Sequence, residues 1–496
     1  MEMIMARRLI HWWLVLIFIG AVALPQHARA QNGTTVYLPL ISRNFNPLAG
    51  QRIVNAPFLN VADITGQKFN EMAIFWFGRV SQTENYTDVR VGYNATELVI
   101  YTATIDRRLW YDTSPSAGDL TAWDSVTVLL DLDGVVDGRP TSNTYRFDAQ
   151  LTNGGELNSN YKASYVGNGT TFVPQPVSFI ASSGWRGGAI NNDGDDKGWV
   201  MTFRIPFSSL GVSAPAQGAA MWGLSVVTHD RDSQAGPALT DKTWPEMADL
   251  LTPSTWGRLA WGLQTSHSSD TGATAIIKHK GASGTDLSMV VKDAGVGGST
   301  VCGGSFDYWT EWGNKNDKDY NGGSPHPVLN VQNQSDISDY PCFSKIYLSF
   351  PLTTLPANKT INKATLRLYQ TGGSGPASNG QGPFSALIQV LSFGEDFSDT
   401  AVTWNNAPLA LRNYTRTLVQ PIPETCDSVG SITWPCVPYD WDVTQLVTEA
   451  YQQGKPARII LYSADSDYST GKYFTSSNTG DWNHAGRPTL TIRYNP

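Results

Sequence analysis

Short segments of alternating apolar and polar residues recur along the whole chain, with Gly, Asp, Asn and Pro between them. Such segments occur at 97–105, 125–131, 144–149, 199–205 and 222–227, and again at 345–350, 364–369, 386–391, 457–462 and 489–494. A period of two is typical of strands with one buried face. Because no long helical periodicity separates them, the pattern predicts an all-β protein of antiparallel, jelly-roll-like sandwiches.

One segment in the second half has a different period. In residues 442–454 the apolar side chains recur at helical spacing, and Gly454 follows the last of them. Asp442 stands where an N-cap is expected, with Gln445 three residues later. We expect one short amphipathic helix here, packed on the second sandwich.

The length of 496 residues fits two sandwiches of 200–250 residues each. The segment Gln264 to Asp270 is polar and separates a Trp- and Gly-rich ending from a new set of strands. We therefore predict a first sandwich at 51–262, a linker at 263–273 and a second sandwich at 274–496. Residues 31–50 contain a short apolar stretch at 36–41 and then a polar segment with Pro and Gly, and they are predicted to be a tether.

The first thirty residues have the pattern of a secretory signal peptide. Arg7 and Arg8 precede an apolar run at 9–24, and Ala28-Arg29-Ala30 offers a cleavage site. The alternative is an uncleaved anchor, but the run is shorter than the roughly 20 residues that span a bilayer. We expect a secreted protein, extracellular or on the cell surface, with no membrane span after cleavage.

The four cysteines are an even set in the second half of an exported chain, so disulfides are expected. Three connectivities are possible, and we favour Cys302 with Cys342 and Cys426 with Cys436. A zinc site is the alternative, but no spacing is C-x-x-C and the histidines are scattered singly. The formal net charge of −8, without a Lys/Arg run, argues against a nucleic-acid partner.

Residues 52–262 resemble the carbohydrate-binding module family 9-like sandwiches. The resemblance rests on the strand at 98–106, on Trp123 to Asp131, on Phe203 to Gly211 and on the late strand at Trp222. It implies a β-sandwich that binds sugars between aromatic rings and holds structural calcium.

Residues 270–496 resemble the disaggregatase-related repeat family, often labelled DNRLRE, which is similar to carbohydrate-binding module family 96. Four stretches carry this resemblance: 361–369, 402–408, 441–444 with the predicted helix, and 473–477 followed by 487–490. It implies a non-catalytic appendage of a secreted or surface protein, with polysaccharide binding in some branches of the family.

Sugar binding uses flat aromatic rings with polar groups around them, so tryptophans among polar residues are the candidates. Six have this setting: Trp110, Trp123, Trp185, Trp244, Trp309 and Trp312. The alternative is that each ring anchors a core or a corner, because aromatic side chains bury large areas wherever they can.

Two Asp-rich turns could hold calcium, which takes six to eight oxygen ligands. The candidate ligands are Asp131 and Asp133 in the first turn, and Asp193 and Asp195 in the second. Both turns also read as ordinary Asp-Gly turns that need no metal.

We expect a secreted, non-catalytic protein that adheres to extracellular or cell-wall polysaccharide or oligosaccharide. Nucleophile, zinc-protease and phosphate-loop motifs are absent from the sequence. One alternative is a glycoside hydrolase or polysaccharide lyase, for which Asp307 and Glu311 are the best carboxylate pair. The other is a structural surface or matrix protein that binds proteins.

Overall fold

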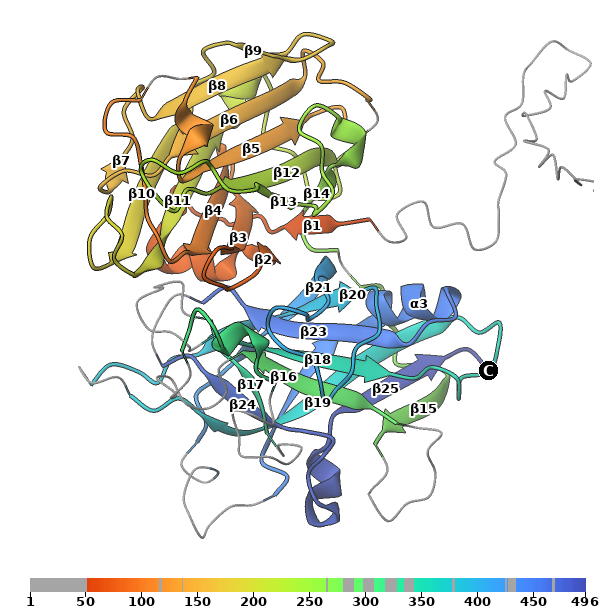
Figure 1. Ribbon diagram of the computed structural model, residues 1–496. Coiled ribbons are helices and arrows are strands. Elements are labelled where there is room, and N and C mark those ends of the chain that lie inside the picture. The colour runs from red at the N-terminus through yellow and green to blue at the C-terminus, as the bar shows by residue number, and fades with distance from the viewer. Residues whose placement is uncertain are drawn as a thin grey trace, which may run out of the picture. The chain divides into compact units, whose positions relative to one another are not determined.

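The computed structural model describes residues 51–496 except 116–117, 136, 265, 280–289, 298–306, 317–327, 334–342, 377–379, 424–425, 427–433 and 466–468. Residues 48–496 form one compact unit of two β-sandwiches, which confirms the predicted all-β fold (Figure 1). The predicted signal peptide, the tether, Cys302 and Cys342 lie outside the described residues. No helix among those described is long and apolar enough to cross a membrane.

The first sandwich contains the first fourteen strands. They are β1 (Ile53–Ala56), β2 (Ala73–Gly78), β3 (Tyr86–Tyr93), β4 (Glu97–Ile105), β5 (Ser125–Asp131), β6 (Thr144–Gln150), β7 (Gly155–Glu156), β8 (Lys162–Gly167), β9 (Phe172–Pro174), β10 (Ile180–Gly187), β11 (Asp196–Pro206), β12 (Trp222–His229), β13 (Lys242–Trp244) and β14 (Gly257–Trp261). One sheet has the order β2-β3-β4-β11-β10-β7, and the other has the order β1-β14-β12-β5-β6-β8-β9, with β13 beside β12.

The second sandwich contains the remaining strands and one α-helix. They are β15 (Ala273–Lys278), β16 (Lys292–Gly297), β17 (Val328–Val331), β18 (Ser344–Phe350), β19 (Ile361–Gly373), β20 (Ala386–Phe393), β21 (Ala410–Val419), β22 (Val437–Asp442), α3 (Thr444–Gln452), β23 (Ala457–Ser463), β24 (Lys472–Thr475) and β25 (Thr489–Tyr494). Strands β16-β18-β23-β20-β21 continue the first sandwich's sheet that begins with β1, because β21 pairs with β1, so these strands form one 13-stranded sheet with it. The other sheet has the order β15-β25-β19-β24-β17, with β22 beside β19. The domain limits at 262 and 274 stay a prediction, because residues 48–496 form one unit.

The predicted helix forms, but it begins one residue later than a cap at Asp442 requires. The N-cap is Val443, and Asp442 still pairs with Thr365 in the sheet. The Asp442 carboxylate instead accepts hydrogen bonds from the backbone N–H and the hydroxyl of Thr444. Gly454 follows the helix with a φ of 64°, as its position predicts. Leu446 and Val447 are buried in the second sandwich.

A shared apolar cluster joins the two sandwiches. Trp76 from β2 and Tyr86 from β3 belong to the same buried cluster as Trp404 and Tyr462 of the second sandwich. Trp76 and Tyr462 contact each other edge to face, with ring centroids 5.3 Å apart, and Tyr86 and Trp404 are 5.0 Å apart. Contacts between buried aromatic rings make this boundary resemble the interior of a domain.

Lys345 from β18 is buried inside this cluster. Its Nζ lies 3.6 Å from the ring centroid of Trp404 and 3.9 Å from that of Trp76, and it donates a hydrogen bond to the Tyr86 hydroxyl. Burial lowers the pKa of Lys345 well below its usual value, and the Asp88 carboxylate opposes this shift. The aromatic faces also favour the ammonium form.

Asp88 from β3 is the carboxylate that completes this network. It accepts hydrogen bonds from the hydroxyls of Tyr86 (2.7 Å) and Tyr462 (2.9 Å) and from the Asn333 amide (3.0 Å). Its side chain is buried, so each of these bonds replaces one to water. Asp88 therefore connects the first sandwich to two segments of the second.

We predict that Asp88→Ala lowers the free energy of unfolding by about 3 kcal/mol, because Lys345 and two tyrosine hydroxyls lose their buried partner. Urea unfolding followed by tryptophan fluorescence measures this effect. Asp270→Ala, which breaks an exposed pair with Lys363, is the matched control and should change stability little. Equal effects of the two variants would contradict the role given to Asp88.

Candidate functional site

Four of the six predicted tryptophans are buried. The exposed fractions are 7% for Trp110, 2% for Trp244, 6% for Trp309 and 0% for Trp312. Trp244 stacks on Phe75 with ring centroids 4.0 Å apart. Rings this deeply buried have no open face for a sugar. They are core side chains, which was the alternative interpretation of the sequence.

Trp309 and Trp312 show why polar neighbours in the sequence were misleading. Both rings pack against Tyr308, with centroids 5.1 and 5.0 Å apart, and Trp312 also contacts Trp404 at 5.1 Å. All belong to the cluster shared by the two sandwiches. The polar residues of this segment face outward, and its rings fill the boundary between sandwiches.

Trp123 and Trp185 are half-buried. The Arg231 guanidinium lies 4.3 Å from the ring centroid of Trp123 and covers one face of that ring. Trp185 packs partly against the core of the first sandwich, and its Nε1 donates a hydrogen bond to Asn153 Oδ1 at 3.3 Å. Each ring keeps only part of its surface for a ligand.

Two tryptophans that the sequence analysis did not select are the exposed ones. Among the described tryptophans only two count as exposed: Trp482, which is largely open to solvent (68% exposed), and Trp434, which is partly open (37% exposed). Their rings contact each other at nearly a right angle, with centroids 5.1 Å apart and an interplanar angle of 86°. We call these two rings the exposed tryptophan pair.

Trp434 is held close to a disulfide. It precedes β22, and Cys436, two residues later, is bonded to Cys426 with the Cα atoms 5.9 Å apart. This confirms one of the two favoured cysteine pairs. Trp434 is followed by Pro435, which has no N–H to donate to a ladder, so this segment leaves the sheet and carries the ring outward.

Trp482 lies in the short 3₁₀ helix η7 (Asp481–Gly486), between β24 and β25. The buried Arg487 guanidinium donates to the Thr479 carbonyl and pairs with Asp481 at 3.0 Å. Lys278 Nζ donates to the Ala485 carbonyl at 2.8 Å. These bonds hold the segment against the sandwich, while the Asp481 carboxylate stays about half exposed beside the ring.

Only one of the two predicted Asp turns brings carboxylates together. Asp131, Asp133 and Asp137 offer oxygens that all lie within 4.8 Å of one another. Asp131 is fully buried, its Oδ2 has no hydrogen-bond partner, and burial raises its pKa to about 6. A buried carboxylate oxygen without a partner is unusual in proteins and suits a cation ligand.

The second predicted turn is arranged differently. Asp193 is exposed, and Asp195 forms ion pairs with Arg107 at 2.9 Å and Arg108 at 3.3 Å. Among the described residues neither joins a carboxylate group close enough to share an ion. Two arginines therefore balance the charge of the Asp195 side chain.

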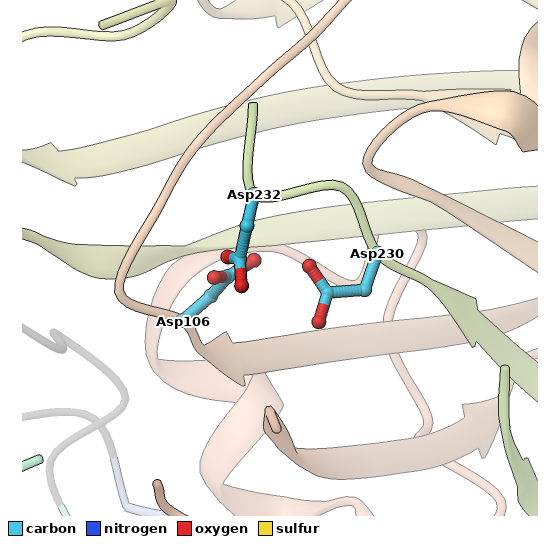
Figure 2. Close-up of side chains that lie close together, drawn as sticks. All are labelled: Asp106, Asp230 and Asp232. Carbon is cyan, nitrogen blue, oxygen red and sulfur yellow. The ribbon is translucent and has the colours of Figure 1, made fainter. Parts of the chain in front are cut away.

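A second carboxylate group, which the sequence analysis did not select, lies at one end of the first sandwich. Asp106 directly follows β4, and Asp230 and Asp232 follow β12, and Figure 2 shows the three carboxylates facing one another. Their oxygens all lie within 4.8 Å of one another, and Asp106 and Asp230 are buried. Carboxylate oxygens at this spacing suit the calcium that the resemblance to family 9 modules implies.

Asp307, which forms with Glu311 the best carboxylate pair for an enzyme, is held in the ionised form. Asp307 accepts hydrogen bonds from the backbone N–H and the hydroxyl of Thr310, at 2.7 and 2.6 Å. These bonds lower the pKa of Asp307, whereas a general acid needs a raised one. Asp307 lines a pocket of about 460 Å³ whose other charged groups include Arg186 and Lys197.

Both exposed tryptophans lie in the part of the chain that matches a known protein family. Residues 305–494 match carbohydrate-binding module family 96. No curated protein sequence matches the chain. The match covers most of the second sandwich and confirms that this half resembles that family.

Three similar solved structures cover less than half of the chain. A family 9 carbohydrate-binding module from Caldicellulosiruptor kristjanssonii in complex with cellotriose is 14% identical, with a TM-score of 0.31 over 45% of this chain and 98% of that one. The same type of module from that organism in complex with glucose is 17% identical, with a TM-score of 0.31 over 45% and 100%. A putative carbohydrate-binding protein from Bacteroides uniformis is 11% identical, with a TM-score of 0.31 over 43% and 100%.

We predict that Trp482→Ala changes the free energy of unfolding by less than about 0.5 kcal/mol, because the ring is mostly exposed. Trp312→Ala should cost about 4 kcal/mol, because it empties a buried ring site. Urea unfolding of both variants measures the difference. A large loss of stability in Trp482→Ala would mean that its ring is a structural anchor.

Proposed function

We propose that the protein binds polysaccharide through the exposed tryptophan pair. The observation that carries this proposal is a largely exposed indole ring, Trp482, in contact with the partly exposed ring of Trp434, within the residues that match carbohydrate-binding module family 96. Single exposed apolar side chains are common on protein surfaces, but aromatic rings that contact each other form a contiguous apolar patch, which is typical of a binding site.

The chemistry of the exposed pair suits a sugar. The faces of a pyranose ring carry C–H groups, which pack on an indole face and remove apolar area from water. The hydroxyls at the edge of the sugar need polar partners. Asp481, about half exposed, and His484 lie in the same 3₁₀ helix as Trp482 and supply a carboxylate and an imidazole.

The right angle between the rings limits the form of the ligand. A flat crystalline surface requires coplanar aromatic rings, because all its chains present one plane. Rings at 86° can stack on one sugar and border it from the side. We infer that the site takes a soluble chain, a chain end or an oligosaccharide.

Two further properties belong to the same proposal. The signal-like residues 1–30 support secretion, and the disulfide between Cys426 and Cys436 fits an oxidising compartment. The protein would then act outside the cell or on its surface, by adhesion. Membership of residues 270–496 in the disaggregatase-related repeat family stays a prediction.

Structural calcium at Asp131, Asp133 and Asp137 is also proposed. The donors are carboxylate oxygens, the type of ligand that calcium prefers, and the unpartnered Oδ2 of buried Asp131 fits an ion. Asp133 also accepts hydrogen bonds from the Asn143 amide at 3.0 and 3.1 Å, which orient its carboxylate. Bound calcium would hold the turn that follows β5.

We predict that Trp482→Ala and Trp434→Ala each weaken polysaccharide binding at least about tenfold, or about 1.4 kcal/mol. The test is affinity electrophoresis of the full chain in gels that contain soluble β-glucan, xylan, mannan or pectin. Phe58→Ala, which removes an exposed ring (47%) from the first sandwich, is the matched control.

Three outcomes would contradict the binding proposal. They are no retardation in any gel, equal loss in Phe58→Ala, and a strong preference for crystalline cellulose in a pull-down. New reducing ends or unsaturated sugars in the same samples would show turnover and favour the enzyme alternative.

We predict that calcium raises the thermal stability of the wild-type protein and that Asp133→Asn removes part of this gain. At a calcium concentration of 100 times the dissociation constant, one site contributes about 2.7 kcal/mol. Asp193→Asn, in the other predicted turn, is the control and should keep the full gain. Identical calcium responses of wild type and Asp133→Asn would exclude this turn as a site.

A further inference from the structure

A sheet face of the second sandwich lies open to water beside the exposed tryptophan pair. Four neighbouring strands form it, in the order β15, β25, β19 and β22, and Figure 1 shows the first three of them together. Along β19 the buried Leu366 and Leu368 alternate with Thr365, Arg367 and Tyr369, whose side chains point to the opposite side. We call this outward side of the four strands the outer face.

The strand registers arrange the side chains of the outer face in rows. One row takes a residue from each strand: Lys278, Thr489, Arg367 and Asp440. The next row has the same form: Ile276, Thr491, Thr365 and Asp442. Neighbouring strands lie about 4.8 Å apart, so a row crosses about 14 Å of surface. This length is enough for several linked sugar rings.

The outer face borders both segments that carry the exposed tryptophan pair. On one side, Lys278 Nζ donates a hydrogen bond to the Ala485 carbonyl of η7, the helix that contains Trp482. On the other side, Trp434 lies shortly before β22, which begins at Val437. A sugar chain longer than the pair can cover therefore meets the outer face next.

The Arg367 and Asp440 side chains give the outer face hydrogen-bonding groups in a fixed arrangement. Arg367 Nε and Nη2 donate to the two carboxylate oxygens of Asp440 at 2.7 and 2.6 Å. Both side chains remain nearly half exposed, at 46% and 43%. The guanidinium keeps further N–H groups, and the carboxylate keeps further lone pairs, for an additional partner. A sugar hydroxyl both donates and accepts, so neighbouring hydroxyls of one sugar ring match this pair.

The charges of the outer face favour an uncharged ligand. The two rows hold two cations, Lys278 and Arg367, and two carboxylates, Asp440 and Asp442. A polysaccharide with a carboxylate on every sugar would bring like charges close to these two aspartates. It would gain little in return, because the guanidinium of Arg367 is already paired.

A protein partner fits the outer face poorly. The centre of a protein interface is apolar, whereas Ile276 is the one large apolar side chain in the two rows. Three of the other residues in these rows are threonines, Thr365, Thr489 and Thr491, and their hydroxyls add further hydrogen-bonding groups. The composition of the rows suits the hydroxyls of a sugar chain.

We propose that an uncharged polysaccharide chain extends from the exposed tryptophan pair across the outer face, where Arg367 and Asp440 bind its hydroxyls. This inference rests on the proposed sugar-binding function of the pair. The pair then holds one sugar, and the outer face holds the sugars that follow it in the chain. The protein recognises a run of sugars within a chain, and its affinity grows with the length of that run.

The test is isothermal titration calorimetry of the full chain with soluble xylan, mannan and β-glucan oligosaccharides, from the disaccharide to the hexasaccharide. The hexasaccharide of the bound type should bind at least about tenfold more tightly than its disaccharide, because it also reaches the outer face. A hexasaccharide of galacturonic acid should bind at least about tenfold more weakly than the uncharged one, because its charges meet carboxylates.

Arg367→Ala and Asp440→Ala are the variants of the outer face. Each should weaken hexasaccharide binding about tenfold and leave disaccharide binding unchanged, whereas Trp482→Ala should weaken both. The two residues form an exposed pair, so the stability of either variant should change little. Asp396→Ala, which breaks the exposed pair with Lys292 of the opposite sheet, is the matched control and should bind like the wild type.

Three results would overturn the proposal. The first is a single affinity for all lengths that is lost in Trp482→Ala, which would show that the pair binds sugar without the outer face. The second is wild-type binding by Arg367→Ala and Asp440→Ala at every length. The third is a preference for the galacturonic acid hexasaccharide. If no oligosaccharide of any length or charge binds the wild type, the proposed function of the pair fails together with this inference.

Discussion

The contact between Lys345 and its ring of aromatic side chains, with Asp88 beside it, determines much of what the rest of the chain can do. It places an amine and a carboxylate in the interior, with rings from both sandwiches around the amine. Trp309 and Trp312, which the sequence suggested as sugar-binding residues, are buried in this boundary. The ligand-binding potential is then left to rings outside the shared cluster, and Trp434 and Trp482 are such rings.

The two sandwiches carry different chemistry. The first holds both carboxylate groups: one at the end of β5 and in the segment after it, and the other where the segments after β4 and β12 meet. The second holds the exposed tryptophan pair, supported by a disulfide and by the buried Arg487. In this arrangement, ions would hold the loops of the first sandwich, and the aromatic rings of the second sandwich would bind sugar.

The strands and the single α-helix could be predicted because a period of two or of 3.6 residues is local information. All ten alternating segments became strands, and only the helix cap was displaced, by the pairing of Asp442 with Thr365.

The residues of the candidate sites were harder to predict from the sequence. Whether Trp309 is exposed depends on a partner more than 200 residues away, and Asp106 meets Asp230 only after the sheets stack. Trp482 had a usable signal, since it stands in the polar run Gly480 to His484.

The shared cluster also limits how this protein could be divided and reused. Many domains move between proteins as independent pieces, because each has its own core and few contacts cross its boundary. Here a cut after β14 would expose Trp76 and Tyr86 on one side and Trp404, Tyr347 and Tyr462 on the other. Either half alone would expose this apolar surface to water and would tend to aggregate. The two sandwiches are therefore expected to be inherited, fused and engineered as a pair.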